Sequence, residues 1–225
     1  MNVYALQRAV SLGEQVADIL RQRIVRGELS SGERLTEEAL AEEFSVSRGP
    51  IRDALTQLSF EKLVEVNRPG GVFIVGLTDE DVEQLYSLRE ALEQLALRRA
   101  MRVKEEERWT PSLDAVARME RSAGVRDPSE FARADLAFHS HIYELAEHPR
   151  LLSAWHQYLP TFAALLEVTI NHDQDLHDSA EDHQRLYEVI RAGNVDVAAS
   201  VLTKHLEGAA ARMNSELASR RLSQL

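Results

Sequence analysis

The sequence contains no cysteine, so neither a disulfide nor a thiolate-bound metal centre can form in this chain. Its first residues lack the charged-then-apolar layout of a signal peptide. No apolar run approaches the roughly 18 residues that a membrane-spanning helix needs. Internal repeats and low-complexity segments are also lacking. We therefore expect a soluble protein of the cytoplasm that makes no membrane contact.

The length of 225 residues suits two domains, and the apolar content of 44% is enough for hydrophobic cores. Residues 36–55 are typical of two short helices joined by a tight turn. Thr36 can accept hydrogen bonds from the free amides of the first helix, and Glu37 and Glu38 are well placed in its first turn. Leu40 and Phe44 form the side that this helix is expected to bury.

The second helix of this pair is predicted to begin after Ser47, which can cap it. Pro50 is tolerated in its first turn because that turn has no internal acceptor for the missing amide hydrogen. Its apolar positions follow the helical spacing and predict a buried face of Ile51, Ala54, Leu55 and Leu58. Arg48, Arg52 and Thr56 form a separate row that suits a DNA major groove. The alternative is that both arginines are ordinary solvated charges of a small three-helix domain.

The flanking segments complete a winged helix-turn-helix over residues 9–76. Residues 15–26 predict a helix that ends near Gly27 and turns four apolar side chains inward, namely Val16, Ile19, Leu20 and Ile24. Residues 63–66 and 72–75 are strand-like, and residues 67–71 between them form a turn. Three helices followed by a two-stranded wing are therefore expected.

These motifs resemble the N-terminal domain of the GntR superfamily of transcriptional regulators. The resemblance lies in the segments IVRGEL from Ile24, GERL from Gly32 and VSRGPIRDAL from Val46, and in the glycine-tipped wing. It implies that Arg34, Arg48 and Arg52 touch DNA and that Gly70 and Gly71 let the wing approach the minor groove. Some members carry arginine where this chain has Glu38, so Glu38 is not a predicted contact. The full predicted DNA-binding set is Arg34, Thr36, Ser47, Arg48, Gly49, Arg52, Arg68, Gly70 and Gly71.

Positive charge is scarce for a DNA-binding protein, since the formal net charge is -11. Residues 1–76 hold 9 Lys and Arg against 11 Asp and Glu, a net charge of -2 that leaves -9 for the remainder. This balance argues against a protein that coats DNA without sequence preference. Binding is expected to depend on clustered arginines and to weaken with salt.

Residues 78–218 are expected to form an all-helical domain. Thr78 resembles a helix cap, and Pro128, Pro149 and Gly193 separate the later helices. The predicted spans are 78–103, 106–123, 128–147, 149–170, 178–192 and 194–218, which together make a six-helix bundle.

Four polar residues of this bundle, Asp135, His139, His183 and His205, stand where apolar side chains are expected. Burying them is costly unless they are paired, and a divalent cation bound by all four would pair them at once. The alternatives are histidines that are hydrogen-bonded in the core, or a simple pair of Asp135 with His139. The layout is similar to the metal-binding effector domain, called FCD, of the FadR-like GntR branch, and this resemblance implies the same four ligands. The set favours Zn or Ni, with Mn as a further candidate; the other histidines are interpreted as surface or structural.

Arg89 lies on the inward face of the first helix of the bundle, where a guanidinium would pair well with a carboxylate. The alternative is an internal ion pair with a glutamate such as Glu93 or Glu167. In the FCD pattern an arginine of this segment faces the ligand, so the resemblance implies that Arg89 binds a small carboxylate effector.

The sequence therefore predicts a homodimeric transcriptional regulator, a repressor, that binds a palindromic operator and responds to an organic acid at a metal centre. One alternative is a repressor that senses the metal ion itself. Another is a metal-dependent hydrolase fused to a DNA-binding domain. Against the hydrolase, we find no His-Glu-x-x-His helix and no glycine-rich phosphate loop.

Overall fold

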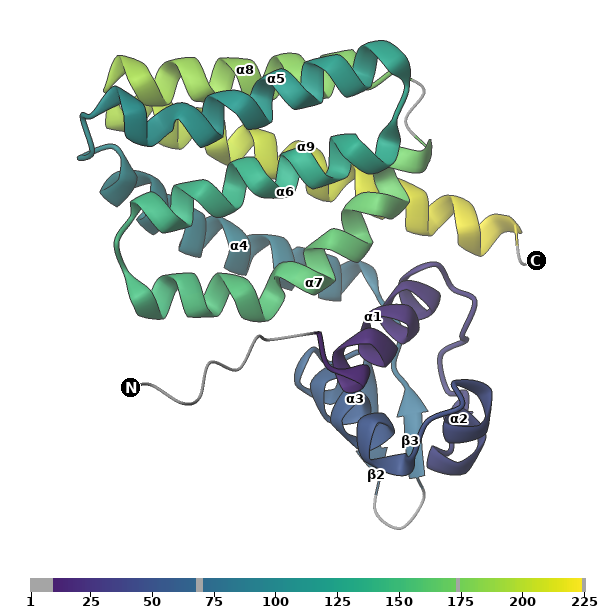
Figure 1. Ribbon diagram of the computed structural model, residues 1–225. Helices are drawn as coiled ribbons and strands as arrows, with labels where there is room; N and C mark the ends of the chain where they lie inside the picture. Colours follow the sequence, from purple (N-terminus) through teal and green to yellow (C-terminus); the bar gives the residue numbers. More distant parts are fainter. Residues whose placement is uncertain (1–9, 68–70, 173–174, 224–225) are drawn as a thin grey trace, which may run out of the picture. The chain divides into compact units, whose positions relative to one another are not determined.

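The computed structural model of the chain describes residues 10–67, 71–172 and 175–223 (Figure 1). The chain divides into two compact units, Met1–Leu77 and Thr78–Leu225. Two residues of the predicted DNA-binding set, Arg68 and Gly70, lie outside the described residues.

The N-terminal unit is a winged helix-turn-helix. Its elements are α1 (Leu12–Val25), β1 (Arg34–Leu35), α2 (Glu37–Glu43), α3 (Arg48–Phe60), β2 (Val64–Asn67) and β3 (Gly71–Ile74). Helices α1 and α3 pack against each other, and side chains from all three helices and from the sheet close one apolar core. Burial of these apolar side chains is the main force that holds so small a unit together. Ile19 is an exception to the prediction, because it is 45% exposed and does not join this core.

The sheet differs from the predicted two-stranded wing. It has three antiparallel strands in the order β1-β3-β2, with Leu35 opposite Val72 and Val66 on the other side of the same residue. The two residues of β1 are too few to show a strand pattern, because their pairing is decided by the distant strand β3. The consequence is that Arg34 becomes part of the wing.

Local capping explains where the first helices begin. Ser11 forms a capping box with Glu14 at the start of α1, and the Thr36 hydroxyl accepts from the Ala39 amide at the start of α2. Ser47 does stand at the N-terminus of α3, but its side chain makes no capping hydrogen bond, so that part of the prediction is wrong. The Ser47 hydroxyl is exposed instead, next to the arginines of α3.

The second unit contains only helices among its described residues. These are α4 (Asp79–Ala100), η1 (Glu106–Trp109), α5 (Thr110–Val125), α6 (Pro128–Leu145), α7 (Pro149–His172), α8 (His177–Ala192) and α9 (Val195–Ser223). Helix α6 packs against α4, α5 and α7, while α9 packs against α4, α7 and α8 (Figure 1). The side chains of α6 therefore point toward several neighbours at once, which makes it the natural place for an internal site.

Capping residues again define these helices. Thr78 and Asp81 form a capping box that begins α4, and Asp127 caps α6, whose first residue is Pro128. Gly193 ends α8 with a φ of 85°, a conformation that favours glycine.

The predicted fold class, a winged helix-turn-helix followed by a helical bundle, is confirmed. Within the described residues, no helix has both the length and the hydropathy required to cross a bilayer.

Candidate nucleic-acid interface and metal centre

Helix α3 presents one apolar face to the core and one polar face to solvent. The residues facing the core are Ile51, Ala54, Leu55 and Leu58. On the opposite face Arg48, Gly49, Arg52 and Thr56 are exposed. Folding thus leaves the predicted row of two arginines and a threonine accessible, as a helix that enters a groove requires.

Both arginines of this row are held by carboxylates from the first turn of α2. Arg48 Nη1 lies 3.0 Å from Glu38 Oε1, and Arg52 Nε lies 2.7 Å from Glu37 Oε2. These pairs are largely exposed, so each contributes little to stability. They orient the guanidinium groups, and they also offer a carboxylate that competes with DNA phosphates.

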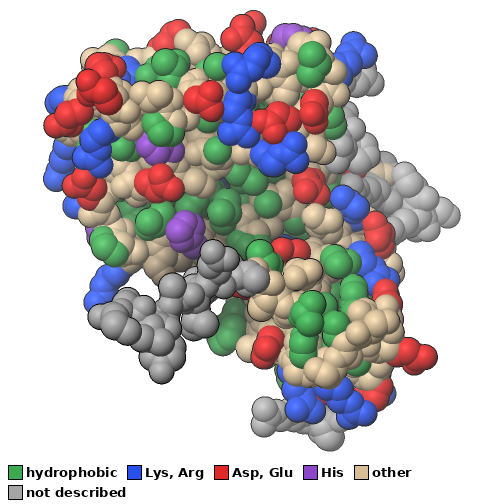
Figure 2. All heavy atoms as spheres, viewed as in Figure 1, with side chains coloured by type: hydrophobic (Ala, Val, Ile, Leu, Met, Phe, Trp, Pro, Cys, Tyr) green, Lys and Arg blue, Asp and Glu red, His purple; other side chains and the backbone are tan. Residues whose placement is uncertain are grey.

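The wing contributes Arg34 and Gly71. Gly71 has a φ of 109°, and a Cβ at this position would lie 2.9 Å from the Arg34 Nε. The guanidinium of Arg34 therefore packs directly over the backbone of the wing, where a larger residue than glycine would displace it. Figure 2 shows Lys and Arg side chains gathered at the edge of this unit where β2 ends and β3 begins. A basic edge of this kind suits contact with a phosphate backbone.

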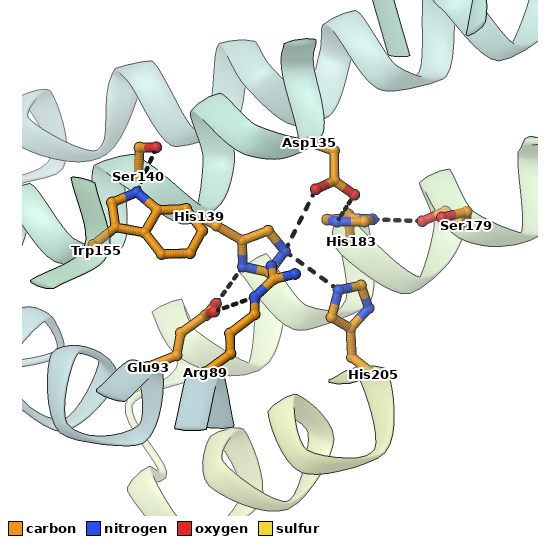
Figure 3. Close-up of polar contacts among 9 residues, drawn as sticks. All are labelled: Arg89, Glu93, Asp135, His139, Ser140, Trp155, Ser179, His183 and His205. Atoms are coloured by element: carbon orange, nitrogen blue, oxygen red, sulfur yellow. Dashed lines mark hydrogen bonds and ion pairs between the residues drawn. The ribbon is translucent and has the colours of Figure 1, made fainter. Parts of the chain in front are cut away.

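In the helical unit, three buried imidazoles meet from three different helices (Figure 3). His139 comes from α6, His183 from α8 and His205 from α9, and one ring nitrogen of each lies within 4.8 Å of the others. Asp135, one turn before His139 on α6, adjoins the cluster: Oδ2 lies 3.0 Å from His183 Nε2 and Oδ1 lies 3.9 Å from His139 Nε2. The structure thus brings together the four residues predicted as metal ligands.

Hydrogen bonds at the outer ring nitrogens set the direction of two imidazoles. His183 Nδ1 lies 2.7 Å from the Ser179 carbonyl oxygen, and His139 Nδ1 contacts the Glu93 carboxylate. Each Nδ1 then carries the proton that it donates, which leaves Nε2 with a lone pair directed into the cluster. This arrangement of outer acceptors is common behind metal-binding histidines.

One distance within the cluster matches the spacing of two ligands on a zinc ion. Two ligand atoms about 2.0–2.1 Å from a zinc ion at a tetrahedral angle are about 3.3 Å apart. His139 Nε2 and His205 Nε2 are separated by 3.3 Å. Nitrogen and carboxylate ligands of this kind favour Zn or Ni, with Mn as a further candidate, so the donor set does not select one metal.

Burial and neighbouring charges set the protonation of the cluster. Burial lowers the pKa of His139, and burial together with the other two imidazoles lowers the pKa of His205 well below its usual value. Burial opposes the charging of His183, but Asp135 outweighs it and raises the His183 pKa. Burial likewise acts against ionised Asp135, yet the imidazoles of His183 and His139 hold the pKa of Asp135 below its usual range. A cation binds neutral imidazoles and an ionised carboxylate, so the lowered pKa values of His139, His205 and Asp135 favour metal binding, whereas the raised pKa of His183 means that a proton competes with the metal there.

Arg89 forms an internal ion pair and keeps one donor atom without a partner among the described residues. Its Nε lies 3.1 Å from Glu93 Oε2, which is the internal ion pair named as the alternative. Its Nη2 is nevertheless buried without a hydrogen-bond partner in the described structure, and only 5% of the residue is exposed. Burial lowers the pKa of this guanidinium, but Glu93 and Asp135 outweigh burial, so its pKa is raised and it stays charged. An unpaired, charged donor is therefore available to a ligand.

A small cavity lies beside the cluster and is lined in part by Arg89, Asp135 and His205. Its volume is about 20 Å³, enough for a water molecule and less than a small acid needs. The remaining lining residues are Tyr86, Leu166, Thr169, Ile170, Ser179, Ala209 and Arg212. Sequence reasoning did not assign any of these to the site, because they stand on four helices with no shared motif.

The sequence analysis also underestimated the role of Glu93 in the site, because it considered Glu93 only as a partner of Arg89. It is fully buried and contacts both Arg89 and His139, so it connects the arginine to the metal cluster. Its spacing of four residues from Arg89 on one buried helix face was the available signal. His141, which was interpreted as surface or structural, is buried and hydrogen-bonded to Ser112 with 2.6 Å between Nδ1 and Oγ.

A winged helix-turn-helix followed by an all-helical unit is the layout of a class of protein, the two-domain transcriptional regulators. Comparison with known proteins agrees with this class. Residues 12–74 match the family described as bacterial regulatory proteins, gntR family, and residues 84–208 match the FCD domain. The chain belongs to the GntR family of transcriptional regulators and carries an FCD domain, so it is a DNA-binding regulator and not an enzyme.

Individual proteins similar to this chain are also transcriptional regulators. The gluconate operon transcriptional repressor of Bacillus licheniformis is 34% identical over 183 residues, which cover 81% of this chain and 74% of that protein. The gluconate operon transcriptional repressor of Bacillus subtilis strain 168 is 32% identical and covers 79% of this chain and 72% of its own length. A solved GntR regulator from Rhodococcus sp. RHA1 has a TM-score of 0.63 at 25% identity, with 89% of this chain and 96% of that chain covered.

Proposed function

We propose that this regulator is a homodimeric repressor that binds a palindromic operator and responds to a small carboxylate held at a metal centre. The observation that carries the proposal is the buried, unpaired Nη2 of Arg89 in the same cavity as Asp135 and His205. A cation at Asp135 and the histidines would present open coordination positions to an acid, and Arg89 would pair with its carboxylate. The repressors of gluconate operons named above act on the genes of an acid, which agrees with this ligand class.

The metal is proposed to lie between Asp135, His139, His183 and His205. His183 Nε2 and Asp135 Oδ2 are 3.0 Å apart and pair with each other, and a cation bound by both atoms would take the place of the proton that they share. When bound, the ion would supply a Lewis-acidic position for one oxygen of the acid. His139 would remain oriented by Glu93, and His183 by the Ser179 carbonyl.

Metal content tests this assignment. The protein purified without chelator is expected to hold one divalent ion per subunit by elemental mass spectrometry. His183→Ala should lose most of this metal, because removing one ligand of the site lowers its affinity for the ion. The control is His156→Ala, an exposed histidine of α7 outside the cluster. Full metal content in His183→Ala would refute the ligand set.

Operator binding is proposed to use Arg48 and Arg52 in the major groove, with Arg34 and Gly71 at the wing. The support is their exposure on one face of α3 and on the basic edge of the wing. Arg48→Ala should weaken operator binding by about 1–3 kcal/mol if Arg48 reads a base. Unchanged affinity would remove Arg48 from the interface, and the same test applies to Arg52.

The acid and the operator are proposed to be coupled. If the DNA-competent arrangement binds the acid less well, the acid weakens operator binding, and DNA weakens acid binding by the same factor. Arg89→Gln should keep operator affinity and lose the response to acid, measured by fluorescence anisotropy of labelled operator. Chelation in the absence of acid is the companion measurement: if it alone changes operator affinity, the protein senses the metal ion.

The dimer is proposed to form through the outer face of α4. Leu88 and Leu95, two helical turns apart, are 37% and 46% exposed on this face. The first turn of α4 is acidic and its last turn is basic. Antiparallel pairing of two α4 helices about a twofold axis would join the leucines and place each acidic end beside a basic end. Acting on an operator, such a dimer would work in the cytoplasm.

A further inference from the structure

Two guanidinium groups line the cavity, at different depths. Arg89 on α4 is buried and already carries an ion pair with Glu93. Arg212 on α9 is exposed and forms no ion pair with any described residue. The cavity therefore has a charged donor at its inner end and a second one at its rim.

The helix itself directs Arg212 toward the site. Arg212 Nη1 lies 3.5 Å from the position that a Cβ of Gly208 would take, so its side chain folds back along α9 over that glycine. This direction leads toward His205 and away from the C-terminal end of the helix. Leu166 and Ile170 of α7 and Ala209 of α9 are the apolar part of the lining beside it. With no carboxylate of its own, Arg212 is available to a group at the cavity mouth.

The formal charges of the site leave room for more than one negative group. Arg89 and Glu93 offset each other, and Asp135 offsets half the charge of a divalent cation on the histidines. The other half of that charge and the charge of Arg212 remain. A single carboxylate could compensate only one of them, whereas a second carboxylate would also make a charge-assisted hydrogen bond with Arg212.

We infer that the effector is a dicarboxylate, with one carboxylate at Arg89 and the metal centre and the other at Arg212. The inference rests on the function proposed above, because it concerns the same site. The second carboxylate would lie at the rim, so the dicarboxylate needs no more enclosed volume than a monocarboxylate does. Arg212 then selects between acids of one and two negative charges and takes no part in holding the metal.

The test compares acids of equal length on the metal-loaded, full-length protein by isothermal titration calorimetry. A series of unbranched dicarboxylates from malonate to adipate is measured against the monocarboxylate with the same number of carbons. Gluconate is included as a hydroxylated monoanion. At least one dicarboxylate is expected to bind about 10-fold more tightly than its matched monocarboxylate, the strength of one added charge-assisted hydrogen bond.

Two variants assign the preference to Arg212. Arg212→Gln is expected to lose the preference by weakening only the dicarboxylate, and Arg212→Lys to restore part of it. Arg185→Gln on α8 is the matched control, an exposed arginine outside the cavity lining. Unchanged metal content and melting temperature in Arg212→Gln exclude a folding defect.

The outcomes separate the two levels of the argument. Binding of monocarboxylates, gluconate included, as tightly as every dicarboxylate would overturn the inference and keep the proposed acid sensor. A dicarboxylate preference that survives in Arg212→Gln would also overturn it. If no acid of either class binds the wild type, the proposed sensor itself is wrong and the inference falls with it.

Discussion

Arg48 and Arg52 reach the surface of α3 already paired with Glu38 and Glu37. In the proposed interface, a DNA phosphate or base must therefore displace these carboxylates or share the guanidinium with them. Weakly held phosphates lose this competition more readily than a base edge bound in a fixed geometry. The two glutamates would thus lower binding to random DNA more than binding to the operator.

Replacing Glu38 tests this effect at the scale of one residue. Glu38→Gln should tighten binding to random duplex DNA by about 2- to 5-fold, since an exposed ion pair contributes about 0.2–1 kcal/mol. The operator should gain less, so the ratio of specific to nonspecific affinity falls. Fluorescence anisotropy at several salt concentrations measures both.

Glu42→Gln is the control, because Glu42 is an exposed acid of the same helix that makes no ion pair among the described residues. Equal tightening in both variants would mean that net charge alone is responsible and that the pairing of Glu38 with Arg48 has no role.

At the scale of elements, helix α3 depends on its packing against α1. Arg21 of α1 forms a buried bidentate ion pair with Glu61, the residue that ends α3. Arg21 Nε lies 2.6 Å from Glu61 Oε2, and Arg21 Nη2 lies 2.7 Å from Glu61 Oε1. Burying two charges costs hydration, and their mutual contact offsets that cost only while both partners are present. This pair holds the C-terminal end of α3 against α1.

Glu61→Gln should therefore destabilise the N-terminal unit by about 3 kcal/mol, since Arg21 keeps its burial and loses its main partner. Amide hydrogen exchange of α1 and α3 in the full-length chain reports the change without requiring that the two units unfold together. The double variant Arg21→Met with Glu61→Leu should be less unstable than Glu61→Gln alone. Glu65→Gln, an exposed acid of β2, should stay within about 0.5 kcal/mol of the wild type.

At the scale of the whole molecule, the proposed function requires two copies of α3 with the spacing of the two halves of an operator. A regulator with twofold symmetry presents them to the two halves of a palindrome. The exposed leucines of α4 are the surface that the proposed dimer would cover. Operator binding and dimerisation should therefore fail together when this face is altered.

Leu95→Glu is the corresponding variant. Two copies of Leu95 are buried per dimer at about 1.5–3 kcal/mol each, so dimerisation should weaken at least about 100-fold. Sedimentation velocity measures the mass, and the same samples are titrated with operator. Leu113→Glu is the matched control, a leucine of α5 with 48% exposure outside the proposed interface. A dimer that persists in Leu95→Glu would place the interface elsewhere.

Much of the fold could be predicted because helix limits are local events. Thr36, Thr78 and Gly193 act through atoms a few residues away, and they mark helix ends in the sequence as well as in the structure. Strand β1 could not be predicted, since Arg34 and Leu35 become a strand only by pairing with β3. Ile19 follows the helical spacing of a core residue, but 45% of it stays exposed in the part of the chain that the structure describes.

The sequence by itself determined the identity of the polar residues and the helix face on which each stands, because helical periodicity is a property of neighbouring positions. It therefore predicted Asp135, His139, His183, His205 and Arg89 as inward-facing groups. Only the tertiary structure decided that the three histidines from α6, α8 and α9 meet, that Glu93 contacts both His139 and Arg89, and that Arg212 joins the same cavity. Such convergence depends on how separate helices pack, and the spacing of residues along one chain does not contain that information.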